Sequence, residues 1–185
     1  MNYLNRKFDK NGLLLAEYQG KLFEESVDSL KCSSPIFIRK FSISDLADDL
    51  DKNESSLVSL DLHDGINSIK KQFNFKNVSS NIKYNKEAMF WIGYLYRYVS
   101  YTRSVSTSFV IDLFDYKELY RNYYVYHTQD MEWIIKSLLE KRSLTNNYFN
   151  PNYRYKKNYL SIYNWYNSSY IISYIIFCIL IANMS

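Results

Sequence analysis

Residues 86–103 read KEAMFWIGYLYRYVSYTR and make up the most strongly helical stretch of the chain. One face of this helix is aromatic, with steps of four, four and three residues between Phe90, Tyr94, Tyr98 and Tyr101. That spacing places the rings along a single stripe of a helix. Asn85 precedes the stretch and is a residue type that caps helix N-termini. The stretch therefore predicts an amphipathic helix, the most strongly marked of the chain.

Shorter patterns on both sides predict further helices. Before it, helical spacing or capping residues mark segments near 10–31, 35–41, 45–50 and 60–73, with Asp9 or Asn11 as the first cap. After it, Ser106, Asp115 and Thr128 each precede a short apolar segment and are expected to cap it. Only 4 Gly and 2 Pro occur, which argues against a sheet built from tight hairpins. The sequence predicts an all-α fold, a compact bundle of about seven helices, several of them short.

The distribution of charge divides the chain after residue 142. Residues 1–142 carry all 19 acidic residues and are nearly neutral, whereas residues 143–185 have no acid and are rich in Tyr and Asn. We therefore expect a helical domain at 1–142 and an atypical tail at 143–185. A nearly neutral body also argues against nucleic acid as a partner, because backbone phosphates bind clustered Lys and Arg.

The tail ends in an uncharged, apolar run from Tyr170 to Ala182. Three interpretations stay open for it. Residues 165–184 could form a marginal membrane anchor with Arg154, Lys156 and Lys157 on the cytoplasmic side. They could instead form a buried final helix or strand, or the whole tail could come from a shifted reading frame. The N-terminus has no apolar signal region, so a cytoplasmic body is expected.

Most motifs of enzyme chemistry are missing. No glycine-rich phosphate loop and no G-x-S-x-G elbow occurs. The two histidines, His63 and His127, lack the spacing of metal ligands, so neither a metal nor a cofactor is expected.

One catalytic pattern is present between Arg121 and His127, in the sequence RNYYVYH. It resembles the motif of HEPN-type ribonucleases, which are all-helical and need no metal. The resemblance implies that His127 acts as general base or acid on a ribose 2′-hydroxyl and that Arg121 stabilises the phosphorane charge. The simpler interpretation is that His127 and Thr128 end one element and cap the next.

Three longer stretches carry a second resemblance: CSSPIFIRKF at 32–41, MFWIGYLYRY at 89–98, and LYRNYY with YHT between 119 and 128. Together they resemble an uncharacterised family of small Firmicutes proteins, often encoded beside ADP-ribosyltransferase-like proteins in cassettes of the toxin–antitoxin or defence type. The resemblance covers about residues 15–140 and ends before the tail. It implies an antitoxin-like or accessory role, with the ADP-ribosyltransferase-like toxin as a partner, and it names no site.

Two of these stretches combine arginine or lysine with aromatic residues, the types that dominate protein interfaces. The residues expected to bind a partner protein are Phe37, Arg39, Lys40, Phe41, Trp91, Tyr94, Arg97 and Tyr98. The alternative is that the aromatic stripe belongs to the core, with Arg97 at its edge. We thus expect a non-catalytic protein-interaction factor, with the metal-free ribonuclease as the alternative.

Overall fold

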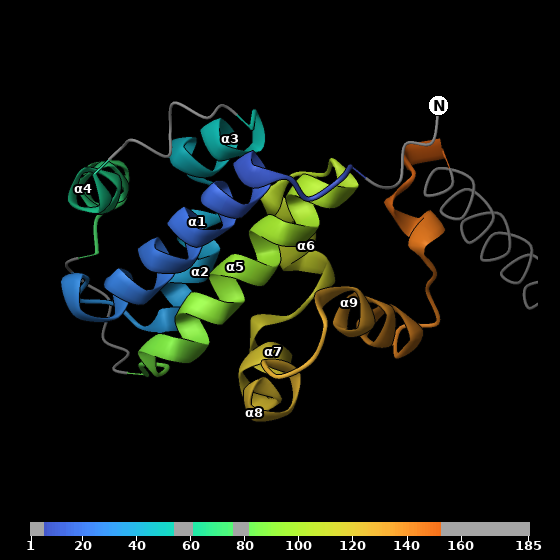
Figure 1. Cartoon of the computed structure of the whole chain (residues 1–185). Helices are drawn as coiled ribbons and strands as arrows, with labels where there is room; N and C mark the ends of the chain where they lie inside the picture. Colours follow the sequence, from blue (N-terminus) through green and yellow to red (C-terminus); the bar gives the residue numbers. More distant parts are fainter. Residues whose placement is uncertain (1–5, 54–60, 76–81, 153–185) are drawn as a thin grey trace, which may run out of the picture. The chain divides into compact units, whose positions relative to one another are not determined.

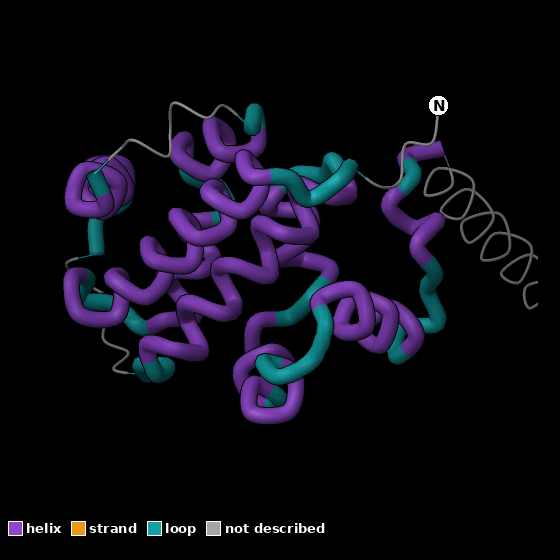
Figure 2. The backbone as a smooth tube through the Cα atoms, in the orientation of Figure 1, coloured by secondary structure: helices purple, strands orange, loops and turns teal. Residues whose placement is uncertain are grey.

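The computed structural model describes residues 6–53, 61–75 and 82–152, and the regular structure within these ranges is entirely helical (Figures 1 and 2). The all-α prediction is confirmed, with nine α helices in the described ranges, seven of them at least seven residues long. In chain order they are α1 Lys10–Ser29, α2 Ser34–Phe41, α3 Asp45–Asp51, α4 Leu62–Gln72, α5 Lys86–Arg103, α6 Thr107–Leu113, α7 Tyr116–Arg121, α8 Tyr123–Tyr126 and α9 Met131–Glu140. A short 3-10 helix, η2, follows at Asn146–Phe149.

The chain divides into two compact units, Met1–Thr145 and Asn146–Ser185. The apolar run at 170–182 lies outside the described ranges. Its three interpretations, as a membrane anchor, a buried helix or strand, or a shifted reading frame, therefore stay predictions. Within those ranges, no helix has the length and apolar character needed to cross a bilayer.

Polar side chains begin several helices where the sequence predicts. The side chain of Asn85 accepts a hydrogen bond from the backbone amide of Ala88 at 2.7 Å and starts α5. Of the two candidates for α1, Asp9 is the cap and accepts from Gly12 at 3.0 Å. Ser44 caps α3 in the same way, accepting from Ala47 at 3.1 Å. Each cap satisfies a backbone donor that the helix itself leaves unpaired.

The segment after α7 departs from the prediction in two places. Asn122 adopts a non-helical backbone and separates α7, the short helix expected after Asp115, from α8, which was not predicted. The expected cap of α9, Thr128, is wrong, because Asp130 stands directly before the helix and its carboxylate accepts from the amides of Glu132 and Trp133. A carboxylate with two amide donors satisfies more of the helix end than one hydroxyl does.

The centre of the body is the antiparallel pair α1 and α5, which lie side by side (Figure 1). Gly93 of α5 makes the close approach possible. A Cβ atom at this position would lie 2.7 Å from Cγ of Phe23 and 2.8 Å from the backbone oxygen of Gln19. Gly20 of α1 serves the same purpose, since its Cβ would meet the backbone oxygen of Phe90 at 3.0 Å. In an isolated helix, each of these two glycines would lower helix stability. In the folded chain, each is a contact point between α1 and α5.

We expect Gly93→Ala to lower the free energy of unfolding by about 1–3 kcal/mol, because the added methyl group meets backbone that cannot yield without separating the helices. Helix propensity alone predicts the opposite sign, a gain of about 1 kcal/mol. Urea unfolding of Gly93→Ala and of the wild type measures the sign of this change. Lys21→Ala, at an exposed position of α1, should change stability by less than about 0.5 kcal/mol. A rise in the midpoint for Gly93→Ala would contradict this packing.

Candidate functional site

The eight residues predicted to bind a partner divide into a buried group and a surface group. Phe37, Phe41, Trp91 and Arg97 have at most 7 % of their surface exposed, so they belong to the core and the prediction that they face a partner needs correction. The physical reason is packing within the body. The ring of Phe23 on α1 meets Phe37 and Phe41 edge to face, at centroid distances of 5.1 and 4.9 Å.

Arg97 is the most unexpected of the buried residues, with no exposed surface. Its Nη1 donates to Oδ1 of Asp51 at 2.7 Å and its Nη2 donates to the Thr107 hydroxyl at 2.6 Å. Its Nε donates to the side-chain oxygen of Gln19 at 2.9 Å. Burial lowers the pKa of Arg97, and the charge of Asp51 opposes that change. The guanidinium therefore joins α1, α3, α5 and α6, and it does not lie on the edge of a surface stripe.

Asp51 completes this network from the last position of α3. Its second oxygen, Oδ2, accepts from the backbone amide of Thr107 at 2.8 Å and so holds the start of α6. Thr107, which Asp51 binds, and Gln19, which accepts from Arg97, are both fully buried. None of these three residues was singled out from the sequence, where Asp51 is one acid among several at the end of a short helix.

The remaining predicted residues lie in two separate places. Arg39 and Lys40 are exposed on α2, where Arg39 Nη1 donates to the Tyr116 hydroxyl at 2.9 Å. Lys40 Nζ lies 5.1 Å from the ring centre of Phe73. Tyr94 and Tyr98 are half-buried on α5. Among the described residues, no contact links the first pair to the second.

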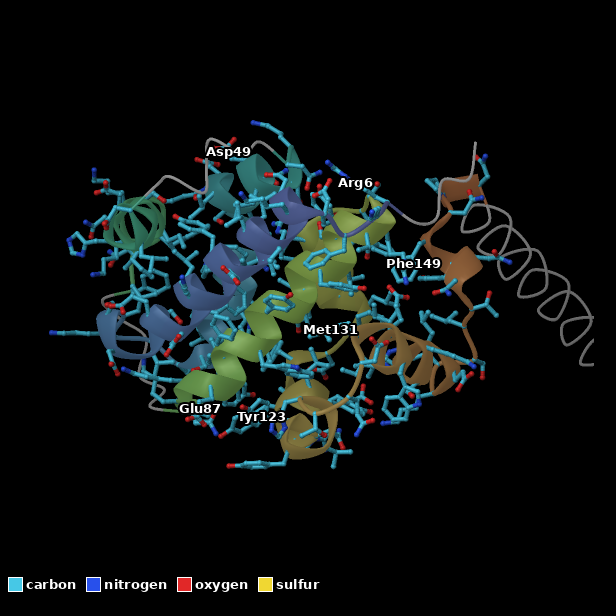
Figure 3. The ribbon with its side chains drawn as sticks, viewed as in Figure 1. Arg6, Asp49, Glu87, Tyr123, Met131 and Phe149 are labelled. Atoms are coloured by element: carbon cyan, nitrogen blue, oxygen red, sulfur yellow. The ribbon has the colours of Figure 1, made fainter. Side chains whose placement is uncertain are left out.

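A different surface is formed by residues 121–128, here called the corner, which contains α8 and both residues of the ribonuclease-like pattern. Tyr123 and Tyr126 turn inward against Trp91, at ring distances of 5.8 and 6.4 Å. Figure 3 shows Tyr123 near Glu87, whose charge adds to burial in raising the pKa of Tyr123. Tyr124 and Val125 turn outward and are 75 % and 60 % exposed.

His127 stands at the end of α8 with a defined orientation. Its Nδ1 lies 2.9 Å from the backbone oxygen of Tyr123, and its ring stacks on Tyr123 at 4.7 Å. Because a carbonyl oxygen only accepts, Nδ1 must carry the hydrogen, which leaves Nε2 as the nitrogen that can accept a proton. The side chain is exposed. The imidazole thus has the tautomer that a general base at Nε2 requires.

Arg121 is also exposed at the corner, where its Nε donates to the backbone oxygen of Lys117 at 3.3 Å. Arg121 and His127 are each held by the preceding turn of their own helix. No hydrogen bond or ring contact between described residues joins the two side chains. The structure places the pair on one surface without bringing it together.

The C-terminal end of α9 clamps the corner to the body. Glu118 of α7 accepts from Nη2 of Arg142 at 2.6 Å and from Nζ of Lys141 at 3.3 Å. Lys141 also donates to the hydroxyl of Tyr126 at 2.6 Å. Burial by itself raises the pKa of Glu118, but the hydrogen bonds from Arg142 and Lys141 outweigh it and keep the pKa below its ordinary 4.5. The corner is therefore braced, which here means that hydrogen bonds from Lys141 and Arg142 hold it and the preceding helix α7 in place.

The clamp predicts a pH-dependent contribution to stability. At neutral pH we expect Glu118→Gln to lower the free energy of unfolding by about 1–2 kcal/mol, because two charge-assisted hydrogen bonds in a partly exposed site are lost. A carboxyl whose pKa is lowered in the folded state stabilises above its unfolded pKa and loses that effect as pH falls through the folded value. The difference between the variant and the wild type should thus be full well above pH 4.5, and it should shrink as the pH falls below 4.5 through the lowered pKa of Glu118 in the folded state.

Unfolding in urea at a series of pH values measures this difference. The control is Glu140→Gln, which removes an exposed pair with Lys136 at 3.9 Å and should have no measurable effect. A Glu118→Gln difference that stays constant down to pH 3 would contradict the assignment.

Comparisons with protein-family models, with curated proteins and with solved structures find no match to this chain. The two resemblances noted in the sequence therefore stay predictions.

Proposed function

We propose that this chain acts by binding another protein, with the outward side chains of the corner, Tyr124 and Val125, as its docking residues. The observation that carries the proposal is their exposure, 75 % and 60 %, between neighbours that are fixed. Tyr123 and Tyr126 on either side pack against Trp91, and Lys141 holds the hydroxyl of Tyr126. A large apolar pair is thus presented to solvent from a braced turn.

Such an arrangement suits an interface for energetic reasons. Tyrosine offers a large ring with few rotatable bonds, so it loses little entropy when a partner covers it. A turn that is already held in place adds no further ordering cost on binding. Arg39 and Arg121 stand on the neighbouring helices α2 and α7, and arginine is the charged residue most enriched at interface hot spots.

The partner we propose is a toxin-like protein of the ADP-ribosyltransferase class, with this chain as its antitoxin or accessory factor. This choice rests on the resemblance of residues 32–41, 89–98 and 119–128 to the Firmicutes family.

A second candidate function is a metal-free ribonuclease of HEPN type. The tautomer of His127 and the exposure of both Arg121 and His127 favour it. In that case Nε2 of His127 would take the proton of a ribose 2′-hydroxyl while Arg121 stabilises the charge on phosphorus.

Co-expression with an ADP-ribosyltransferase-like protein from the same gene cassette, followed by size-exclusion chromatography and titration calorimetry, tests the first proposal. We expect Tyr124→Ala with Val125→Ala to weaken the complex at least about tenfold without changing stability. Ile43→Ala, which removes a side chain 61 % exposed elsewhere on the body, is the matched control and should bind normally. Equal binding by all three proteins would overturn the assignment to the corner.

Incubation of the purified chain with single-stranded RNA separates the two candidates. We expect no cleavage by the wild type. Turnover that is lost in His127→Ala, while the variant keeps the thermal unfolding of the wild type, would replace protein binding with the ribonuclease as the function.

A further inference from the structure

A cavity of about 540 Å³ opens on a part of the body far along the chain from the corner. Its walls come from the C-terminal end of α1, from the last turn of α4 and from the three residues that follow α4, which run past the end of α1 (Figure 1). Its volume lies within the ~300–1,000 Å³ typical of small-molecule sites.

The charge of the cavity has one sign. Lys31, Lys70 and Lys71 line it, and none of the described residues in its wall is acidic. Within the described part of the chain, none of these three lysines forms an ion pair. A wall with three lysines and no acid favours a ligand with negative charge.

Two further lysines reinforce the positive charge. Lys83 Nζ donates to the backbone oxygen of Leu30 at 2.8 Å, and Leu30 lines the cavity. This bond matters because the C-terminal end of a helix carries partial negative charge, which would otherwise repel an anion. Lys40 Nζ lies 5.1 Å from the ring centre of Phe73, another wall residue.

The rest of the wall is apolar and aromatic. The rings of Phe73 and Phe75 meet edge to face at 6.5 Å, with Phe75 buried and Phe73 half-buried. An inorganic anion would gain nothing from these rings, and an apolar molecule would gain nothing from the lysines. A ligand with a flat ring and an anionic group satisfies both, because aromatic side chains stack on bases and lysine binds phosphate as a point charge.

We infer that this cavity binds a nucleoside phosphate, with Lys31, Lys70 and Lys71 at the phosphate and Phe73 and Phe75 against the base. The volume of about 540 Å³ fits a single nucleotide. The three wall lysines give the cavity a local positive charge on a body that is otherwise nearly neutral.

Titration calorimetry of the full chain with AMP tests the inference, with inorganic phosphate and adenosine titrated separately as the two halves of the ligand. We expect AMP to bind saturably and more tightly than either half. Raising the salt concentration should weaken AMP binding, because exposed charges are screened. Phosphate binding as tightly as AMP, or no saturable AMP binding, would overturn the inference.

Two variants locate the site. Lys70→Gln with Lys71→Gln should weaken AMP binding about tenfold or more, since two charge-assisted contacts are lost. Phe73→Leu should weaken AMP while leaving the response to phosphate unchanged. The control is Lys10→Gln with Lys117→Gln, which removes the same charge at exposed positions outside the cavity and should bind AMP normally. Unchanged thermal unfolding shows that each variant is folded, and AMP binding retained by the Lys70 and Lys71 variant would contradict the site.

Discussion

Replacing Asp51 with alanine is expected to lower the free energy of unfolding by about 3–5 kcal/mol, the largest effect we expect from any single charged residue here. Asp51 is the counter-ion of Arg97, whose guanidinium has no exposed surface and lies 2.7 Å from Oδ1. Without the carboxylate, a buried positive charge keeps only neutral partners, Gln19 and the hydroxyls of Thr107 and Ser100. The amide of Thr107 also loses its acceptor, so α6 loses the group that fixes its start.

Urea unfolding of Asp51→Ala measures this effect. Two further variants show whether the loss comes from the unpaired charge of Arg97. Asp49→Ala, on the same helix, removes an exposed pair with Lys52 and should cost less than about 1 kcal/mol. Adding Arg97→Met to Asp51→Ala should restore part of the lost stability, because the uncompensated charge is then gone. Equal losses for Asp51→Ala and Asp49→Ala would show that the network contributes little.

Phe37→Ala is expected to lower the free energy of unfolding by about 3–5 kcal/mol, because it removes a ring that is 1 % exposed and leaves a cavity. The ring contacts Phe23 of α1 at 5.1 Å and Phe41 at 5.9 Å, so two neighbouring aromatic side chains lose packing at once. This variant decides between the two roles proposed for Phe37. A core residue changes stability, whereas a partner-binding residue changes affinity with the fold intact.

The comparison variant for Phe37 is Tyr124→Ala, which removes a ring of similar size that is 75 % exposed. We expect its stability to stay within about 0.5 kcal/mol of the wild type. Thermal and urea unfolding report both variants. If Phe37→Ala were as stable as the wild type but unable to bind its partner, Phe37 would be a partner-binding residue and not a core residue.

Much of the helical pattern was readable from local residues. The helix at 86–103 begins and ends where the aromatic stripe predicts, and Asp9, Ser44 and Asn85 cap helices at the expected places. These features depend on neighbours a few positions away, such as a side chain reaching an amide three residues ahead. The same locality explains the error at Thr128, where two capping residues stand close together and only geometry selects Asp130.

The sequence predicted less well which side chains are buried and which are exposed. Phe37, Arg39, Lys40 and Phe41 are adjacent in sequence and share the chemistry of an interface, yet two are buried and two exposed. The corner was noticed as a catalytic pattern, while the exposure of Tyr124 and Val125 was not foreseen, since tyrosines and a valine in a short helix read as packing. The lysine-lined cavity had no sequence signal, because its wall joins residues 29–31 to residues 70–75.

The sequence by itself determined that the body is helical, where its main helices begin, and that charge balance changes after residue 142. The tertiary structure alone decided that Arg97 is an internal ion partner of Asp51, that Gly20 and Gly93 are contact points, and that Tyr124 faces solvent. The physical reason is distance along the chain. Caps and helical stripes act within one or two turns, whereas burial and ion pairing here join residues more than 40 positions apart, and only the folded chain sets those distances.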